Sequence, residues 1–340
     1  MKIGVDIRPL ISKPTGVGMW LKGLLESLKG KTEHNFVYFS SSLKETPPDS
    51  LRNELPEGKF IHRRLPVRIL DLLLLNYLWP SFEFLTGEKV DVTLSPTPIY
   101  FPTKGKKIIT VHDLYFLEDR EKAGKFSAYL KNLGKSMERA DLIIAVSGYT
   151  EKKLLEFFPD AREKTKVIYE GIRKFPEAEK IENLPEKFLL FIGGCVPRKN
   201  LSTAVEISEM SGIPLVVVGH CNKYPDNTIP IPYASDARLR YLYEKAFALI
   251  FPSLDEGFGL PILEAMNFGL PVLAYPKGAI PEVGGEAVIL CENTEEFVKT
   301  IKKLEDEIYR SEVISKGKKR VRQFSWERAG EEFLKALEEL

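Results

Sequence analysis

Glutamine, cysteine and histidine are scarce in this chain. Glutamine occurs once, at Gln323, and there are four histidines and three cysteines in 340 residues. Cys195, Cys221 and Cys291 have neither metal-ligand spacing nor disulfide spacing. We therefore expect reduced thiols in an intracellular protein. Few thermolabile amides beside abundant Lys and Glu favour a thermophilic source.

Excess charge and long apolar runs are also missing. Lys and Arg number 49 against 48 Asp and Glu, a net charge of +1, which excludes a global field that recruits nucleic acid. No apolar run approaches the roughly 20 residues of a membrane-spanning helix. Residues 1–7, M-K-I-G-V-D-I, predict a strand rather than a signal peptide. We expect a cytoplasmic protein with apolar residues enough for two domains.

What the chain does have is a strand, a Gly-rich loop and a helix at residues 248–268. The apolar run 248–251 predicts a buried strand, and Gly257 and Gly259 belong to the loop. Pro261 suits the first position of the helix, where its missing N–H costs nothing. Backbone N–H groups at such a helix start attract phosphate, and the glycines let a ligand approach the backbone.

Two glutamates flank this helix start. Glu264, inside the helix, can accept two hydrogen bonds from the vicinal diol of a ribose, and Glu256 lies in the loop. Phosphate donors beside a diol acceptor indicate a site for a nucleoside diphosphate. The residues alone are equally compatible with an ordinary surface turn that carries two solvated glutamates.

The spacing of Glu256 and Glu264 carries a family resemblance. The segment E-G-F-G-L-P-I-L-E-A resembles the donor-site signature of retaining glycosyltransferases of family 4, and residues 252–285 are similar to that family without a gap. The resemblance implies an α/β protein of the GT-B fold, with two Rossmann-like domains whose parallel sheets face each other across a cleft that holds the active site. We expect the domains at residues 1–172 and 185–322, with a last helix at 326–340 that packs on the first.

A second Gly-rich loop lies near the N-terminus, between a strand at residues 2–7 and a helix at 19–28. Gly16 and Gly18 are followed by Leu21 where a dinucleotide fingerprint requires Gly, which disfavours a dehydrogenase. The loop resembles the family's T-G-V-G-x-W/Y segment, which implies a place beside the donor phosphates and the acceptor. The alternative is a plain tight turn.

Three charged or titratable side chains complete the expected site. His112 ends a predicted strand at 107–111, and the resemblance implies that it contacts the transferred sugar; a structural histidine is the alternative. Arg198 and Lys199, in P-R-K-N just before a predicted helix at 202–210, match the family's phosphate-binding segment rather than two solvated cations. Many members have Arg at the position of Gly194, so this chain departs from the pattern there.

Residues 67–79 are rich in leucine and follow Arg63, Arg64 and Arg68. A basic, apolar helix of this kind can touch a membrane surface and a lipid-linked acceptor. Because the segment has little polar face, we favour the alternative, that it is packed in the core.

These features together predict a retaining glycosyltransferase that moves a hexosyl unit from a UDP- or GDP-sugar to a hydroxyl acceptor, which is a glycan, a lipid-linked molecule or a small molecule. The residues expected to act in catalysis are His112, Glu256, Arg198 and Lys199, and those expected to bind the donor are Gly16, Gly18, Arg198, Lys199, Gly257, Phe258, Gly259, Leu260 and Glu264. No D-x-D motif is present, so we expect no metal and no other cofactor. The alternatives are a sugar-nucleotide epimerase of GT-B fold and a non-catalytic sugar-nucleotide-binding subunit.

Overall fold

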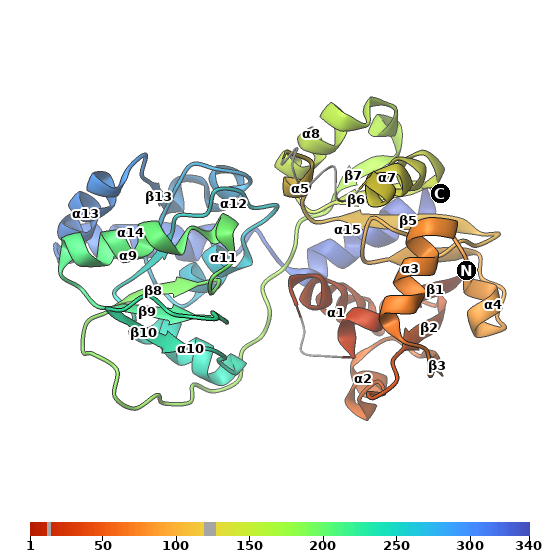
Figure 1. Ribbon diagram of the computed structural model, residues 1–340, viewed down its shortest axis with the longest axis horizontal. Coiled ribbons are helices and arrows are strands. Elements are labelled where there is room, and N and C mark those ends of the chain that lie inside the picture. The colour runs from red at the N-terminus through yellow and green to blue at the C-terminus, as the bar shows by residue number, and fades with distance from the viewer. Residues whose placement is uncertain (12–14, 119–126) are drawn as a thin grey trace. The chain divides into compact units, whose positions relative to one another are not determined.

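The computed structural model describes residues 1–11, 15–118 and 127–340, and among the last it gives the backbone but not the side chains of 127–131. The chain forms two compact units (Figure 1). Unit 1 comprises Met1–Gly171 and Ser325–Leu340, and unit 2 comprises Ile172–Phe324.

Unit 1 is built on a parallel sheet of seven strands in the order β3-β2-β1-β4-β5-β6-β7. The strands are β1 (Lys2–Asp6), β2 (Asn35–Ser41), β3 (Gly58–Arg63), β4 (Val92–Ser95), β5 (Lys106–Val111), β6 (Leu142–Ala145) and β7 (Thr165–Val167). The helices are η1 (Arg8–Leu10), α1 (Gly16–Leu28), α2 (Asp49–Glu54), α3 (Val67–Tyr77), α4 (Phe82–Thr86), α5 (Tyr115–Glu118), α7 (Ser127–Arg139), α8 (Gly148–Phe157), η2 (Pro159–Lys164) and α15 (Trp326–Glu338).

Unit 2 repeats this arrangement with a six-stranded parallel sheet, in the order β10-β9-β8-β11-β12-β13. Its strands are β8 (Leu189–Ile192), β9 (Leu215–Val218), β10 (Thr228–Ile231), β11 (Ala248–Phe251), β12 (Val272–Ala274) and β13 (Val288–Leu290). Its helices are η3 (Pro197–Lys199), α9 (Leu201–Ser211), α10 (Asp236–Lys245), α11 (Leu260–Asn267), α12 (Ile280–Gly284), η4 (Gly285–Ala287), α13 (Thr294–Lys303) and α14 (Glu307–Val321).

Both faces of the unit 2 sheet are covered, as β11 illustrates. Leu249 and Phe251 belong to one buried apolar cluster, which includes residues of α10 and α11. Ala248 and Ile250 belong to the other, which includes residues of α9 and α13. A strand buried on both faces has a continuous apolar sequence, because alternate side chains point to opposite sides. Helices on both faces of parallel sheets are the α/β architecture expected from the sequence.

The last helix belongs to unit 1 and packs against α1, as Figure 1 shows. Ser325 caps it by accepting a hydrogen bond from the backbone N–H of Arg328 at 3.2 Å. A side chain at Gly23 or Gly171 would overlap Trp326, so both glycines make room for that indole.

The leucine-rich segment differs from expectation. Only Leu70 and Leu74 of α3 are buried, whereas Ile69 and Leu72 are exposed. The preferred interpretation of residues 67–79 as a core helix is therefore wrong for most of its side chains. One narrow stripe of an 11-residue helix is enough to hold it against the unit, so Leu73 and Leu75 are only half-buried and Leu72 faces outward.

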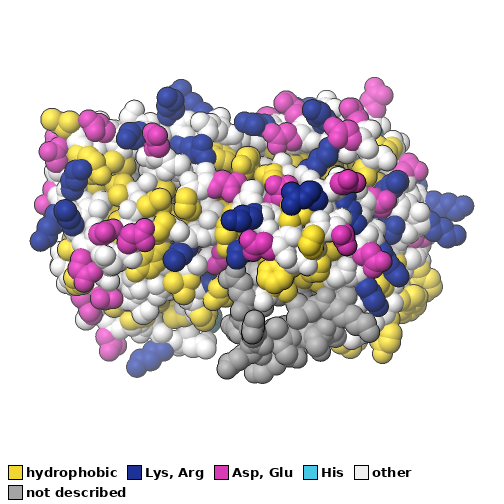
Figure 2. All heavy atoms as spheres, turned by 90° about the horizontal axis from the view of Figure 1, so that it is seen from above, with side chains coloured by type: hydrophobic (Ala, Val, Ile, Leu, Met, Phe, Trp, Pro, Cys, Tyr) yellow, Lys and Arg dark blue, Asp and Glu magenta, His cyan; other side chains and the backbone are white. Residues whose placement is uncertain are grey.

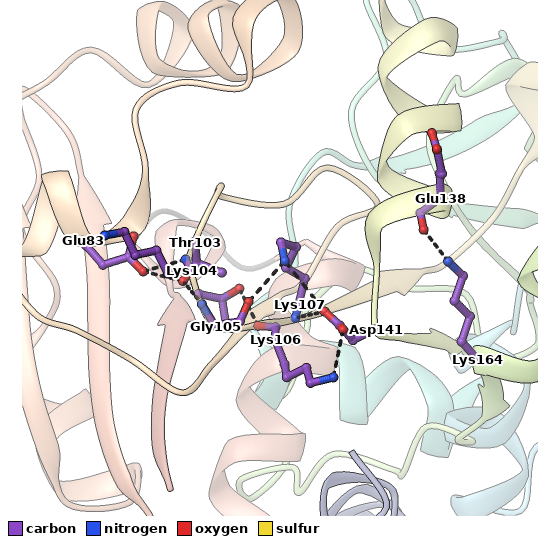
Figure 3. A network of polar contacts seen from close by, with 10 residues as sticks. Glu83, Thr103, Lys104, Gly105, Lys106, Lys107, Glu138, Asp141 and Lys164 are labelled. Atoms are coloured by element: carbon purple, nitrogen blue, oxygen red, sulfur yellow. Dashed lines mark hydrogen bonds and ion pairs between the residues drawn. The ribbon is translucent and has the colours of Figure 1, made fainter.

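Polar contacts that Figure 3 shows fix the start of β5 to α4 and to the residue that precedes β6. The carboxylate of Glu83 accepts from the hydroxyl of Thr103 at 2.5 Å and from the backbone N–H of Lys104 at 3.0 Å. Asp141 accepts from the backbone N–H of Lys107 at 2.9 Å.

Figure 2 shows side chains of both charge signs interspersed on the face drawn, in keeping with the net charge of +1.

Candidate functional site

The predicted residues of unit 2 follow two adjacent central strands. β8 and β11 pair in parallel, and the chain leaves β8 toward β9 on one side and β11 toward β12 on the other. Open α/β sheets bind ligands at the carboxyl ends of strands where the strand order reverses in this way. The loops after Ile192 and Phe251, which carry Arg198, Lys199 and Glu256, therefore meet at the usual ligand position.

The structure brings these three side chains into contact. Arg198 Nη1 donates to Glu256 Oε2 at 2.9 Å, and Lys199 Nζ donates to Glu256 Oε1 at 2.5 Å. Arg198 Nη1 also donates to the backbone carbonyl of Asp255 at 2.9 Å. Burial raises the pKa of the Glu256 carboxyl, but Lys199 and Arg198 outweigh it and hold that pKa below its ordinary value. Glu256 is therefore the anionic partner of two cations.

The cations reach solvent while the carboxylate does not. The Glu256 side chain is 6% exposed, against 14% for Lys199 and 26% for Arg198. The Lys199 ammonium also lies 4.9 Å from the centre of the Phe251 ring, a cation–π contact that further fixes it. Two positive groups are thus held in place at a surface that an anionic ligand can reach.

The helix start predicted beside these residues is present. Gly259 is the N-cap of α11 with φ of +98°, a left-handed conformation that favours glycine. α11 begins at Leu260, so Pro261 occupies its second position rather than the first. Phe258 is buried against the ring of Phe324, with centroids 5.8 Å apart. The loop and the first backbone N–H groups of α11 follow Glu256 directly in the chain. The positive end of the α11 helix dipole and the side-chain cations of Arg198 and Lys199 therefore belong to one site.

The structure explains why Arg is missing at Gly194. Gly194 has φ of +56°, and a Cβ there would overlap the carbonyl oxygen of His220, which follows β9. At the neighbouring Gly193 a Cβ would lie 2.7 Å from Cγ of Lys199. This backbone packs too closely for side chains, and the Lys199 stem lies over it. The positive charge of the site therefore comes from Arg198 and Lys199.

The expectation of three free cysteines is wrong. Cys195 and Cys221 form a disulfide that joins the loop after β8 to the loop after β9, and Cys291 is free and buried. Because the two cysteines are 26 positions apart, the sequence does not show their proximity. Parallel pairing of β8 with β9 brings the ends of both strands together, which places the cysteines side by side.

Glu264 lies within a buried polar network. Its Oε1 accepts from Arg173 Nε at 2.6 Å, and its Oε2 accepts from the hydroxyl of Tyr243 at 2.7 Å. Arg173 also pairs with Asp236 at 2.6 Å. Burial, and then the charge of Glu264, raise the pKa of Tyr243 well above its ordinary value, so this hydroxyl stays protonated and donates. Arg173 Nη2 also donates to Oε2 at 3.4 Å, so of the roughly four acceptor positions of the carboxylate one remains for a ribose hydroxyl.

The other predicted residues belong to unit 1. His112 follows β5, where Nε2 donates to the carbonyl of Pro96 at 3.1 Å and Nδ1 lies 3.6 Å from Glu170 Oε1. The Trp20 ring contacts the imidazole edge to face, with centroids 5.3 Å apart. Gly16 and Gly18 lie in the first turn of α1, which begins at Gly16. The expectation that both belong to a loop is therefore wrong.

Sequence reasoning missed several residues around these sites. Arg173 lies in a charged, Pro-bearing segment that is typical of a linker, and Tyr243 lies in a helix with no motif. Gly278, with φ of +62°, packs against the backbone of Glu256, and the N–H of Ala279 donates to the Glu256 carbonyl at 2.8 Å. No local pattern identifies such contacts, because each joins residues far apart in the chain.

The described residues contain neither a metal-binding cluster nor a membrane-spanning helix. No group of three or more His, Cys, Asp or Glu side chains in the described parts of the chain is arranged to hold a metal ion. Over the same residues, none of the helices has both the length and the apolar character needed to cross a membrane.

Two family models match the chain. The one described as Glycosyltransferase Family 4 matches residues 14–174, and the one described as Glycosyl transferases group 1 matches residues 173–320. The chain belongs to glycosyltransferase family 4. The resemblance carried by Glu256 and Glu264 is thus confirmed at the level of the family.

Curated relatives agree with this assignment. O-antigen chain mannosyltransferase B of Escherichia coli is 27% identical over 230 residues, which cover 58% of this chain and 60% of the relative. O-antigen chain mannosyltransferase RfbU of Salmonella typhimurium is 27% identical over 232 residues, which cover 62% of this chain and 64% of the relative. The chain spans less than two thirds of the length of these two relatives.

Solved structures show the fold. Sucrose-phosphate synthase from Thermosynechococcus elongatus is similar with a TM-score of 0.75 and 18% identity, over 99% of this chain and 98% of that one. HepE from Anabaena, solved in complex with UDP and glucose, gives a TM-score of 0.71 and 15% identity over the whole of both chains. These similarities confirm the predicted GT-B fold of the family 4 chain.

Proposed function

We propose that this chain is a retaining glycosyltransferase that moves a hexosyl unit from a nucleoside-diphosphate sugar to a hydroxyl acceptor. One observation carries the proposal. Arg198 and Lys199 are held together on the buried carboxylate of Glu256, directly before the N-terminus of α11. Two fixed cations and a helix start form a binding surface for a diphosphate.

The reaction needs such a surface because charge moves during it. As the glycosidic bond breaks, the diphosphate gains negative charge and the sugar becomes oxocarbenium-like. Donors that are fixed before the reaction stabilise this change without the cost of reorganisation. In the proposal Arg198 and Lys199, with the backbone of Gly257, Phe258, Gly259 and Leu260, bind the leaving diphosphate.

The two glutamates are given different roles. When the diphosphate takes up the cations, the Glu256 carboxylate is released from part of its pairing and accepts hydrogen bonds from sugar hydroxyls. Glu264 accepts the ribose hydroxyls within its network with Arg173 and Tyr243. For unit 1, we propose that His112 contacts the transferred sugar and that the turn containing Gly16 and Gly18 contacts the donor phosphates and the acceptor.

Retention and metal independence are parts of the same proposal. The acceptor hydroxyl attacks from the face that the diphosphate leaves, and the leaving phosphate takes its proton, so no protein nucleophile is needed. Arg198 and Lys199 supply the positive charge that a divalent cation provides where a D-x-D motif holds one.

Names of relatives suggest which donors to test first. The two curated relatives described above are named mannosyltransferases, and HepE was solved with UDP-glucose as well as UDP. A nucleoside-diphosphate mannose and UDP-glucose therefore head the panel. We further propose a cytoplasmic location with peripheral membrane contact through residues 63–79, where a glycan, a lipid-linked molecule or a small molecule serves as acceptor. The Cys195–Cys221 disulfide is compatible with this location through the thermophilic source that the composition favours, because intracellular proteins of hyperthermophiles retain disulfides.

The test is release of nucleoside diphosphate from a panel of sugar nucleotides, with the purified chain and without acceptor. Slow hydrolysis of one donor, abolished by Lys199→Ala, supports transfer chemistry at this site. Binding of a donor without release, even after addition of simple glycoside acceptors, would identify a non-catalytic subunit instead. Conversion of the sugar while it stays attached to the nucleotide would identify an epimerase.

A further inference from the structure

Exposed large apolar side chains gather on one short segment of unit 1. Of the sixteen found among the described residues, seven lie between positions 65 and 84. They are Leu65, Val67, Ile69, Leu72, Tyr77, Trp79 and Phe84. We call these side chains, together with those of Arg64 and Arg68, the α3 surface. Trp79 and Phe84 contact each other there, with ring centroids 5.4 Å apart.

The α3 surface has a basic character. Arg64 and Arg68 are exposed, and residues 64–82 contain a single acid, Asp71. That acid pairs with Arg8 at 2.6 Å, so its charge is balanced within the unit. The next acid, Glu83, accepts from Thr103 and Lys104 as Figure 3 shows. Glu83 keeps its charge, so the two arginines outnumber the one acid of this segment that the described residues do not pair with a cation.

α3 also lines a cavity of about 640 Å³ at the carboxyl ends of β1 and β4. Its lining includes Asp6, Arg8 and Asp71, together with the apolar side chains of Val67, Leu74 and Ile99. β1 and β4 are the central strands at which the unit 1 sheet reverses its order, which is where ligands bind in such sheets. α3 therefore borders both this cavity and the α3 surface, and Val67 contributes to both.

We propose that the α3 surface docks on an anionic lipid bilayer and lies in its interface. Apolar side chains enter the boundary between headgroups and acyl chains, while basic side chains meet anionic lipid. A neighbouring pair of exposed aromatic rings suits the same depth, because Trp and Tyr rings prefer the interface. An 11-residue helix is too short to span the membrane, for which roughly 20 residues are needed.

Docking would bring the cavity beside α3 to the lipid surface, where a lipid-linked hydroxyl acceptor presents its headgroup. This consequence rests on the proposed transfer reaction, whereas the docking itself does not. The test below therefore measures binding to vesicles, without donor and without turnover.

The experiment is co-sedimentation of the full chain with vesicles of phosphatidylcholine alone, or of phosphatidylcholine and phosphatidylglycerol in equal parts. We expect binding to the anionic vesicles and a much weaker association with the neutral ones. The double variant Ile69→Gln and Leu72→Gln should lose binding, since these side chains are 55% and 58% exposed. Each of Arg64→Gln and Arg68→Gln should weaken it about fivefold, which corresponds to ~1 kcal/mol per basic residue.

Ile308→Gln is the matched control, because Ile308 is 75% exposed but lies on α14 of unit 2. It should bind as the unsubstituted chain does. Circular dichroism of each variant verifies folding, which exposed positions leave intact. Absence of binding to anionic vesicles would overturn the proposal. So would self-association, detected by light scattering, that the Ile69 and Leu72 variant abolishes while vesicle binding stays absent, because the surface would then be an interface between copies.

Discussion

The ammonium of Lys199 lies 2.5 Å from Oε1 of Glu256, although 57 residues separate them in the chain. Arg198 occupies the other carboxylate oxygen at 2.9 Å. The pair of cations is therefore already oriented by a protein carboxylate before any ligand binds. A diphosphate that binds beside Arg198 and Lys199 therefore meets side chains that are already fixed in position and lose little conformational freedom on binding.

This arrangement predicts unequal effects of Lys199→Ala on turnover and stability. We expect kcat to fall about 10²–10³-fold, the usual loss when one group that stabilises developing charge is removed. Stability should fall by only about 1 kcal/mol, because Arg198 still pairs with Glu256. Arg198→Ala should be nearly as damaging to kcat. Steady-state kinetics and urea denaturation of both variants measure the two quantities.

Lys187→Ala serves as the control for these variants. Lys187 pairs with Glu305 at 2.7 Å on the surface of the same unit, away from the switch point of the sheet. Near-normal kcat for Lys199→Ala would refute its role at the diphosphate. Near-normal kcat for Arg198→Ala alone would leave the lysine and the N-terminus of α11 as the whole binding surface.

Glu256 gives a prediction for stability against pH. Its pKa is lowered in the folded state below the ordinary 4.5, so its pairing stabilises the fold fully above pH 4.5. That contribution is lost as pH falls through the lower folded-state pKa. Glu256→Gln should lower the free energy of unfolding by about 1.5–3 kcal/mol near neutral pH. Urea denaturation of the unsubstituted protein and of Glu256→Gln, from neutral to acid pH, measures the difference between their free energies of unfolding. This difference should shrink on acidification, and a difference that stays constant with pH would contradict this account.

Glu264→Ala should affect both binding and stability. Loss of a buried partner of a ribose hydroxyl pair typically costs ~1–3 kcal/mol, or roughly 5- to 150-fold in affinity for a nucleoside diphosphate. The variant also removes one of the two carboxylates that pair with Arg173 and the acceptor of the Tyr243 hydroxyl, which should lower the free energy of unfolding by about 1–3 kcal/mol. Tyr243→Phe removes only one hydrogen bond to Glu264 and is the comparison. Calorimetry that gives unchanged nucleotide affinity for a folded Glu264→Ala protein would refute the ribose assignment.

The disulfide makes a prediction that needs no substrate. In denaturant without reductant, thiol titration should find one free thiol, that of Cys291, and three after reduction. Replacing Cys195 and Cys221 by Ser should lower stability by roughly 3–4 kcal/mol, the estimate for a closed loop of this length. Three reactive thiols in the unreduced protein would show that the bridge is absent in solution.

Metal independence is tested by chelation. With Arg198 and Lys199 as the cations of the site, turnover should persist in excess chelator at the same rate. Complete loss of turnover that magnesium or manganese restores would contradict the proposed role of the two side chains. The Lys199→Ala variant, assayed with and without added metal, shows whether a metal can substitute for the lysine.

The α/β alternation and the Gly-rich loop at residues 252–259 could be predicted because their signals are local. Apolar runs mark the central strands, and Ser147 and Ser325, which are of a residue type that favours N-caps, cap their helices. α14 was missed, since its sequence is charged on most sides and only Val313 and Gly317 are buried. Gly317 lets α14 approach Met266 of α11, a contact that depends on the tertiary arrangement.

The site was predicted where residues act through their own chemistry and missed where they act through packing. Arg198 and Lys199 are recognisable as cations, but nothing near them in sequence indicates that Glu256 holds both. The exposed apolar side chains of α3, among them Ile69 and Leu72, have the same cause. Apolar composition predicts burial on average, and it does not distinguish a buried stripe from an outward one when nearly every position is apolar.

The return of α15 to unit 1 has a consequence for the order in which the protein is made. Trp326 occupies space that Gly23 and Gly171 leave open, so the first unit lacks one of its packing partners until residue 338 has been synthesised. Unit 2, by contrast, has its entire sequence available once Phe324 has left the ribosome. During translation the part encoded second can therefore complete its fold first, while the part encoded first waits for the end of the chain.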